Sequence, residues 1–334
     1  MKKKLMIFGG SGYVGSALIN KLVKINKYEI LNYDLDLFGS KHLPKNKITH
    51  IKGDVRDLIK IKRTIKKFQP NEILHLACIS NDPSYLLNKS LSKDVNYVAF
   101  KKLINLLDTS DIEKFLYAST CSVYGVSNKK NITEDHPQKP LTEYNKFKGE
   151  CEKILKNRKN ENYSTCIIRP STVCGVSTKM RLDLTVNILT NYAFNKGYIK
   201  IFGGQQKRPN LHIEDMIDLY CLLINKKNYS DCNNESFNAG GENLKISTIG
   251  NKEKKIVQKF KKKKINLIYE KSSDKRSYHV NGDKIKKYFG FKPKKTVEDA
   301  IKDLCFFFDK YEKKDTFTNK NFFNVKKLMS IKFK

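Results

Sequence analysis

The chain has 334 residues, which is enough for two fused lobes because a single hydrophobic core stops growing at about 250 to 300 residues. Its 66 Lys+Arg outnumber its 34 Asp+Glu and give a formal net charge of +32. Because the excess is mostly lysine spread along the whole chain, without a recognised nucleic-acid reading module, we favour a solvated surface that attracts anionic small molecules over a nucleic-acid partner.

Short apolar runs alternate with longer amphipathic segments along the first half of the chain. The predicted strands are residues 4–9, 28–34, 49–54, 72–78, 114–120 and 164–170. The predicted helices between them are residues 15–25, 57–68, 98–108 and 144–157. This alternation predicts an α/β fold, a doubly wound parallel sheet covered on both faces, with its ligand crevice at the carboxyl ends of the strands.

The pattern loosens after residue 175. Segments 198–204, 213–225, 264–270 and 297–311 predict a smaller mixed α/β lobe. Residues 313–334 are basic with scattered aromatic side chains, and we predict a basic tail with a disordered end. A weak anion or membrane contact is the alternative for this tail.

The cysteines and the hydropathy pattern indicate the cellular compartment of the protein. Its eight cysteines show no C-x-x-C pair and no spacing typical of a zinc site, so we expect reduced, mostly buried thiols and no metal. No uncharged run approaches the roughly 18 residues that cross a bilayer. We therefore predict a cytoplasmic protein without a membrane partner.

The glycines of GGSGYVG, which are Gly9, Gly12 and Gly15, follow the first predicted strand and open the first helix. Glycine permits a tight turn and a close approach of backbone amides to a diphosphate, which the helix N-terminus then stabilises. Asp34 ends the second predicted strand, where a carboxylate accepts hydrogen bonds from the adenosine ribose and repels a 2′-phosphate. The two features predict a dinucleotide site that favours NAD over NADP.

Tyr144 and Lys148 lie on one face of a predicted helix, because positions i and i+4 are neighbours. A free tyrosine titrates near pH ~10, and a nearby cation favours the phenolate. The pair follows the fifth predicted strand and its hydroxyl-rich end, YASTCSVYG at 117–125. This placement indicates a proton-transfer site at the crevice.

The sequence resembles the extended short-chain dehydrogenase/reductases, in particular the NAD-dependent nucleotide-sugar epimerase/dehydratase group that includes UDP-glucose 4-epimerase-like enzymes. The resemblance runs from about residue 4 to about residue 305. It rests on GGSGYVG, GDVRD (53–57), ILHLAC (73–78), YASTCSVYG, EDHPQKPLTEYNKFKGE (134–150), IIRPSTVCG (167–175), FGGQQKRPNLHIEDM (202–216), FNAGG (237–241), DKRSY (274–278) and FGFKP (289–293).

The resemblance implies a division of the chain and a homodimer. Residues 1–170 would form a Rossmann NAD-binding domain that includes the Tyr/Lys helix. Residues 171–312 would form a nucleotide-sugar-binding lobe, which could be interleaved with the first domain, and residues 313–334 the basic tail. The dimer would pair the helices near 96–108 and 144–157.

The resemblance also implies roles for individual residues. The cofactor-binding residues would be Gly9, Gly12, Tyr13, Val14 and Gly15 at the diphosphate, Asp34, Asp54 and Val55 at the adenosine, and Leu76, Ala77, Asn96, Tyr144, Lys148 and Val173 toward the nicotinamide. The residues that bind the nucleotide-sugar substrate would be Thr120, Tyr144, Thr172, Arg208 and Arg276. The planar fork of arginine suits the substrate diphosphate, and surface ion pairs are the alternative for both arginines. Pro209 stands where the family usually has Asp, and His212 and Asp215 are interpreted as packing or hinge residues.

The implied catalytic residues are Thr120, Tyr144 and Lys148. Tyr144 would take a proton from the sugar C4 hydroxyl, Lys148 would lower the tyrosine pKa and bind the nicotinamide ribose, and Thr120 would orient the hydroxyl. A 4,6-dehydratase would need an Asp-Glu pair directly after Thr120, where this chain has Cys121 and Ser122. Relatives that epimerise at C3 and C5 carry a cysteine one position later than Cys121.

We therefore predict an NAD-dependent nucleotide-sugar 4-epimerase. The first alternative is a nucleotide-4-keto-sugar reductase, and a dehydratase is a weaker one. Two hypotheses come from other classes: a non-catalytic dinucleotide-binding protein, and an RNA-binding protein that uses the +32 charge.

Overall fold

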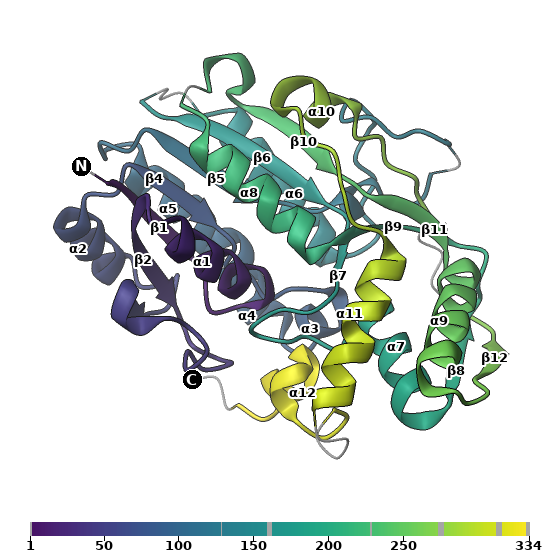
Figure 1. Cartoon of the computed structure of the whole chain (residues 1–334). Coiled ribbons are helices and arrows are strands. Elements are labelled where there is room, and N and C mark those ends of the chain that lie inside the picture. Colours follow the sequence, from purple (N-terminus) through teal and green to yellow (C-terminus); the bar gives the residue numbers. More distant parts are fainter. Residues whose placement is uncertain are drawn as a thin grey trace.

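A computed structural model describes residues 2–127, 129–158, 162–227, 229–272, 277–311 and 316–331 of the chain. Within them, the largest sheet is parallel and lies at the centre of the molecule (Figure 1). Its strands, in spatial order, are β10 (Glu235–Ala239), β6 (Ser164–Pro170), β5 (Lys114–Ala118), β4 (Glu72–His75), β1 (Lys3–Phe8), β2 (Tyr28–Asp34) and β3 (Thr49–Lys52). The order reverses between β1 and β4, and such a reversal opens a crevice at the carboxyl ends of these strands.

Helices cover both faces of the main sheet. One face carries α1 (Tyr13–Ile25), α8 (Ile213–Asn225) and α10 (Asp283–Phe289), and the other carries α2 (Leu58–Phe68), α5 (Ala99–Leu107) and α6 (Glu143–Lys156). The central strands are therefore buried on both faces, which explains their nearly continuous apolar sequences. The predicted doubly wound sheet is confirmed, and β2 and β6 have the predicted bounds.

Shorter segments join the strands to the longer helices. They are α3 (Asp82–Leu86), α4 (Lys89–Lys93), a π-helical turn (Asp94–Val98) and the 3-10 turns η1 (Lys45–Lys47), η3 (Cys121–Tyr124), η4 (Ser230–Cys232) and η6 (Lys320–Phe322). Helix α3 packs beside α6 at the crevice. Among the described helices, none has the length and the apolar character needed to span a membrane.

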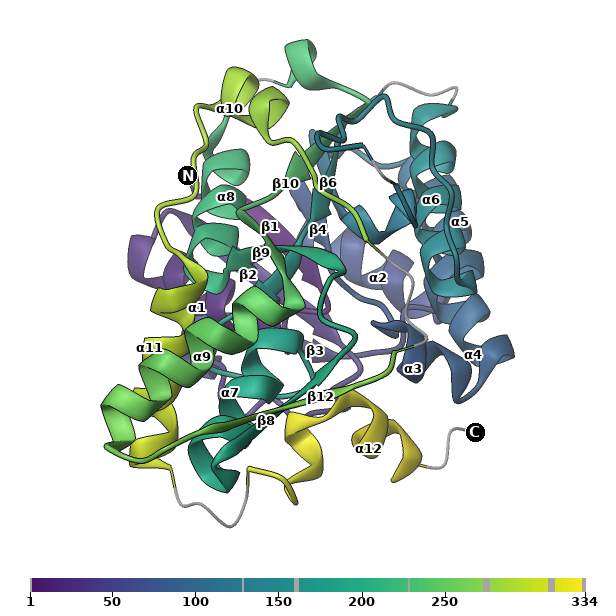
Figure 2. The same ribbon diagram turned by 90° about the vertical axis from the view of Figure 1, so that its right-hand side faces the viewer.

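The second lobe is built from two smaller sheets and a layer of helices. The sheets contain β11 (Glu242–Lys245), β9 (Lys207–His212) and β7 (Thr172–Cys174), and β12 (Asn266–Glu270) and β8 (Tyr198–Phe202); the helices are α7 (Thr185–Lys196), α9 (Ile246–Lys261) and α11 (Val297–Lys310). Figure 2 shows these helices beside β8 and β12. They share one apolar core, to which Ile199, Ile301 and Leu304 belong. Three elements from the range 171–312, β10, α8 and α10, belong to the main sheet and its helical cover instead.

The C-terminal residues 316–331 fold onto the second lobe. Phe322 and Phe323 are buried in its core, and the backbone N–H of Leu182 donates to the carbonyl of Phe322 at 2.8 Å. Helix α12 (Asn324–Met329) then contacts α3 (Figure 2). The prediction of a disordered end was therefore wrong for residues 316–331, because their aromatic side chains bury apolar area against a core that is distant in sequence.

Candidate active site

Two adjoining hollows open at the carboxyl ends of the main strands. The first, the rim pocket, is lined by Gly9, Tyr33, Asp34, Leu35, Leu37, Phe38, Gly53, Asp54, Val55, Arg56, Ala77, Cys78, Ile79, Leu91 and Val95. The second, the central cleft, is lined by Gly9, Gly12, Tyr13, Val14, Gly15, Phe38, Leu76, Ala77, Cys78, Ser80, Ala118, Ser119, Tyr144, Lys148, Pro170, Val173, Lys179, Arg181, Met216, Tyr220 and Asn324. Gly9, Phe38, Ala77 and Cys78 line both hollows, so the two meet beside β1 and β4.

The glycine loop lies between β1 and α1 and forms one wall of the central cleft. Gly9 has φ +83°, and a Cβ atom on it would lie 2.6 Å from the backbone nitrogen of Ala77. Gly12 precedes the first helical residue, and no side chain caps the helix there. The first N–H groups of α1 are therefore available to an anion in the cleft, which fits the diphosphate of a dinucleotide.

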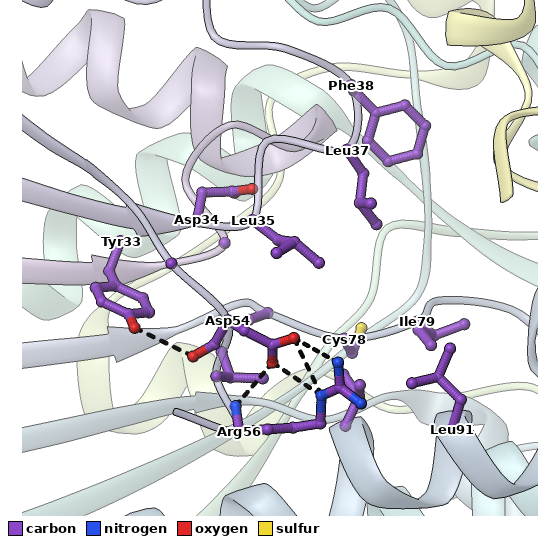
Figure 3. Close-up of a pocket in the computed structure, with 15 residues that line it drawn as sticks. Tyr33, Asp34, Leu35, Leu37, Phe38, Asp54, Arg56, Cys78, Ile79 and Leu91 are labelled. Carbon is purple, nitrogen blue, oxygen red and sulfur yellow. Dashed lines mark hydrogen bonds and ion pairs between the residues drawn. The ribbon is translucent and has the colours of Figure 1, made fainter. Parts of the chain in front are cut away.

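The rim pocket places two carboxylates at the ends of β2 and β3 (Figure 3). Asp34 accepts hydrogen bonds from the backbone N–H groups of Ser11 at 2.9 Å and Asp36 at 2.8 Å, and burial raises its pKa. Asp54 faces Arg56, with 2.6 Å between Nη2 and Oδ2. Burial opposes the ionisation of Asp54, but the hydrogen bonds from Arg56 lower its pKa overall.

Tyr144 lies in the first turn of α6 and lines the central cleft. The side chain of Thr142 caps this helix and donates a hydrogen bond to Asp82 of α3 at 2.6 Å, which fixes the turn that carries Tyr144. Burial raises the pKa of Tyr144 well above its usual range, and Cys78 adds to the effect. Arg181 is the cation that opposes this rise.

Lys148 also lines the cleft, but its ammonium is engaged elsewhere. It donates to the backbone carbonyl of Ala118 at 2.7 Å and lies 4.9 Å from the ring centroid of Tyr117. That Lys148 lowers the pKa of Tyr144 therefore stays a prediction, and Arg181, from a distant part of the chain, is a cation that opposes the rise of that pKa. Helical spacing placed the two side chains on one face but did not determine which group the ammonium contacts.

The residues after β5 hold their hydroxyl and thiol groups in local contacts. Thr120 caps η3, with its Oγ1 accepting from the N–H of Ser122 at 3.1 Å. Cys121 is fully buried and directs its thiol to the carbonyl of Arg169, and burial raises its pKa to about 12. Ser122 shares a hydrogen bond with the hydroxyl of Tyr278 at 3.1 Å. The lining of the central cleft includes none of Thr120, Cys121 and Ser122, so the catalytic role of Thr120 stays a prediction.

A buried ion pair supports the floor of the cleft. The guanidinium of Arg169 on β6 lies 2.7 Å from the carboxylate of Glu152 on α6, and both side chains are almost fully buried. Glu152 also accepts a hydrogen bond from Ser119, the residue before Thr120. This network fixes the end of β5 against the helix that carries Tyr144.

Several predicted site residues lie outside the central cleft. Asn96 binds the backbone of Ile79 through both ends of its amide, at 2.8 and 3.0 Å, so it shapes the loop after β4 and does not line the cleft. Thr172 pairs with Asn210 in the second lobe and is also absent from the lining. Arg276 lies outside the described residues.

A separate hollow, the outer pocket, contains Arg208. Its lining residues are Asp183, Thr185, Ile188, Leu189, Tyr192, Lys200, Phe202, Gln206, Arg208, Ile246 and Ser272.

His212 and Asp215 do not line the outer pocket. His212 caps α8, and Asp215 accepts hydrogen bonds from the backbone N–H groups of Lys294 and Lys295, in agreement with a packing role.

The sequence reasoning missed a polar ring beside Tyr144. Arg181 donates to Ser80 at 3.1 Å and to Asp183 at 2.6 Å. Asn324 of α12 donates to the same two residues, at 2.9 Å through its side chain and 3.0 Å through its backbone. The residues come from segments more than 100 positions apart, so no local motif could have indicated them.

The chain is similar to known proteins over most of its length. The model of the family described as "NAD dependent epimerase/dehydratase family" matches residues 5–240. A UDP-glucose 4-epimerase of Lactobacillus helveticus is 26% identical over 322 residues, which cover 89% of this chain and 94% of that protein.

Solved structures resemble this one closely. The UDP-glucose 4-epimerase of Thermotoga maritima with UDP-glucose has a TM-score of 0.81 at 22% identity, over 92% of this chain and 99% of that one. The dTDP-glucose 4,6-dehydratase of Bacillus anthracis in complex with NAD has a TM-score of 0.78 at 20% identity, over 93% of this chain and 97% of that one. These matches confirm the predicted fold class.

Proposed function

Because the chain belongs to the NAD dependent epimerase/dehydratase family, we propose that it is a nucleotide-sugar 4-epimerase, which oxidises the sugar at C4 to a 4-keto intermediate and returns the hydride to the other face. Family membership confirms the predicted family, the prediction that the chain is an enzyme and the prediction that its cofactor is NAD.

The two hollows fit NAD. Asp34 in the rim pocket suits the adenosine ribose, and the N–H groups of α1 beside Gly12 suit the diphosphate. Tyr144 and Lys148 line the central cleft and not the rim pocket, which suits the nicotinamide half. When bound, NAD accepts a hydride from the sugar and gives it back.

Tyr144 is the proposed proton carrier. Its phenol would accept the proton of the sugar C4 hydroxyl and later return it, while Thr120 orients that hydroxyl and Lys148 binds the nicotinamide ribose. Burial favours the neutral phenol, and Arg181 and the backbone N–H of Asn81 favour its ionisation. Arg181 therefore joins the proposed set as a residue that positions charge near Tyr144.

One observation carries the choice of a 4-epimerase over a dehydratase. Among the described residues that line the central cleft, none is Asp or Glu. Elimination of water from a sugar needs an acid and a base besides the tyrosine, whereas oxidation and reduction at one carbon need a single proton carrier. Cys121 cannot serve as a second one, because its buried thiol points to the Arg169 carbonyl.

The outer pocket is the proposed site of the nucleotide. Arg208 supplies a cation for the substrate diphosphate, and Phe202, Tyr192 and Leu189 supply apolar surface for a base. Arg276 and Thr172 remain predicted substrate contacts on the resemblance alone. We further propose a homodimer through α5 and α6 and a cytoplasmic location, and sedimentation of the purified protein tests the first.

The test is a product analysis without added reductant. The purified protein is incubated with UDP-, dTDP-, GDP- and CDP-hexoses, and products are identified by NMR. We expect interconversion of two sugars that differ at C4. Turnover that appears only with added NAD(P)H would favour the reductase instead, and loss of oxygen from C6 would favour the dehydratase.

A further inference from the structure

Lys179 is a buried cation that the catalytic assignment does not use. It lies in the loop between β7 and α7 and is 6% exposed, and it lines the central cleft. Among the described residues, no carboxylate forms an ion pair with its ammonium. A buried lysine without a counter-ion is unfavourable on its own, so its place in a ligand cleft points to an anionic ligand.

The loop that carries Lys179 is tied directly to the glycine-loop helix. The hydroxyl of Tyr13 donates to the carbonyl of Gly175 at 2.7 Å, and Ser177 donates to the carbonyl of Tyr13 at 2.6 Å. The backbone N–H of Lys179 itself donates to Ser16 of α1 at 3.1 Å. Three hydrogen bonds thus fix the backbone of Lys179 relative to the start of α1.

The ammonium of Lys179 lies where the two hollows meet. It is 3.6 Å from the ring centroid of Phe38, one of the residues that line both the rim pocket and the central cleft. Gly9, another shared residue, belongs to the glycine loop. A dinucleotide that places its adenosine in the rim pocket and its nicotinamide in the central cleft must place its diphosphate at this junction.

We propose that Lys179 binds the diphosphate of the dinucleotide, so that the loop after β7 completes the anion site begun by the N-terminus of α1. The inference rests on the proposed function only in that both need NAD in these hollows. It adds a charged contact from a region in which the sequence motifs indicate no cofactor residue.

The charged groups around Lys179 affect its pKa, so binding of an anion to it should be accompanied by a measurable uptake of protons. Burial, with a smaller contribution from the cation of Arg181, lowers the pKa of Lys179 to about 7, and Asp183 opposes this effect. Lys327 of α12 and His42, which follows β2, are the other titratable groups facing it. Above pH 7 the free protein therefore holds part of Lys179 neutral, and a bound diphosphate would restore its proton.

The first experiment measures binding to cofactor-free protein by calorimetry at pH 6.5. Lys179→Gln should weaken NAD and ADP by about 10- to 100-fold, the range of a lost charge-assisted hydrogen bond, and leave adenosine unchanged. Lys179→Arg should keep the affinity. Lys259→Gln on the exposed side of α9 removes the same charge outside the site and should change nothing.

The second experiment needs only wild type and Lys179→Arg. At pH 8, NAD binding is measured in two buffers of different ionisation enthalpy. Wild type should take up protons on binding, whereas Lys179→Arg should bind with a smaller uptake, because arginine stays protonated. Burial lowers the pKa of His42 below its usual range, so at pH 8 this histidine is neutral in both proteins and the difference in uptake is assigned to Lys179.

Two results would overturn the inference. One is an equal loss of adenosine and NAD affinity in Lys179→Gln, since that would indicate a structural role for the lysine. The other is identical proton uptake in wild type and Lys179→Arg. Failure of every dinucleotide to bind would instead remove the proposed function, so the two failures are distinguishable.

Discussion

The main sheet and the second lobe hold buried acids in different ways. In the main-sheet region, Glu152 pairs with Arg169 and Glu72 pairs with Lys114, and all four side chains are almost fully buried. In the second lobe, Glu253 of α9 is fully buried, and its described partner is the hydroxyl of Thr190 at 3.4 Å. Burial raises the pKa of Glu253 well above its usual range and favours its neutral form, whereas the other two acids are held in ion pairs.

The central cleft and the outer pocket also differ, in how far their surroundings are exposed to solvent. The floor of the cleft is formed by the ends of buried parallel strands and is fixed by the Arg169–Glu152 network. The outer pocket lies on β8, whose Phe202 is 50% exposed, and the pair of Lys200 with Glu270 beside it is solvated. We infer that the rigid region carries the shared redox chemistry and that the more exposed region selects the substrate.

The largest expected effect is on catalysis in the cleft. Tyr144→Phe should lower turnover by roughly 10²- to 10⁴-fold, because it removes the proton carrier and leaves the shape of the site. NAD affinity should not change, and Tyr311→Phe, at the end of α11, should leave turnover intact. Steady-state kinetics and calorimetry measure both quantities; normal turnover in Tyr144→Phe would assign the proton transfer to another group.

The buried pair should dominate stability. Arg169→Met should lower the free energy of unfolding by about 3 to 5 kcal/mol, because it leaves the Glu152 carboxylate buried without its cation. The double variant Arg169→Met/Glu152→Met should recover part of that loss. Urea unfolding measures each value, and Lys200→Met at the exposed pair should leave it unchanged. A loss at Lys200 as large as that at Arg169 would erase the difference between the two regions.

Arg208 should affect substrate binding and little else. Arg208→Met should raise KM for the nucleotide sugar by about 10- to 100-fold, because it removes a charge-assisted contact with the diphosphate. Arg208→Lys should fall between wild type and this variant, since lysine lacks the planar fork. If NAD affinity fell together with substrate affinity, the outer pocket would not be a separate substrate site.

The smallest expected effect is the pH dependence of the second-lobe core. Because the folded-state pKa of Glu253 is raised, its favourable contribution is fully present below the unfolded pKa of about 4.3 and is lost as pH rises through the folded pKa. Glu253→Gln cannot ionise, so its advantage over wild type should grow with pH and reach about 1 kcal/mol or more by pH 8. Unfolding curves at pH 5 and pH 8 give the comparison, and a constant difference would show that folding does not raise the pKa of Glu253.

The parts of the molecule that follow local rules could be predicted from the sequence. The strand 28–34 and the turn of Gly9, Gly12 and Gly15 are set by apolar runs and by backbone geometry, and both occur as predicted. Asp34 is the last residue of β2, and a parallel sheet brings the carboxyl ends of its strands to one edge. Its place at the crevice could therefore be predicted.

The parts that depend on long-range packing could not be predicted. Lys179 and Asn324 reach the cleft from the second lobe and from the C-terminal segment, where the sequence shows only a loop and a basic tail. The ammonium of Lys148 contacts the Ala118 carbonyl, which helical spacing alone does not specify. The contacts of a charged side chain depend on the charges and dipoles around it, and these come together only when segments distant in sequence pack against one another.

The most direct test of the central claim follows the hydrogen at C4. The best substrate of the panel is labelled with deuterium at C4 and incubated with the purified enzyme without added reductant. The account predicts that deuterium stays at C4 in both epimers, because the hydride leaves and returns within one enclosed site. Deuterium in free reduced cofactor, or a product that has lost oxygen at C6, would contradict it.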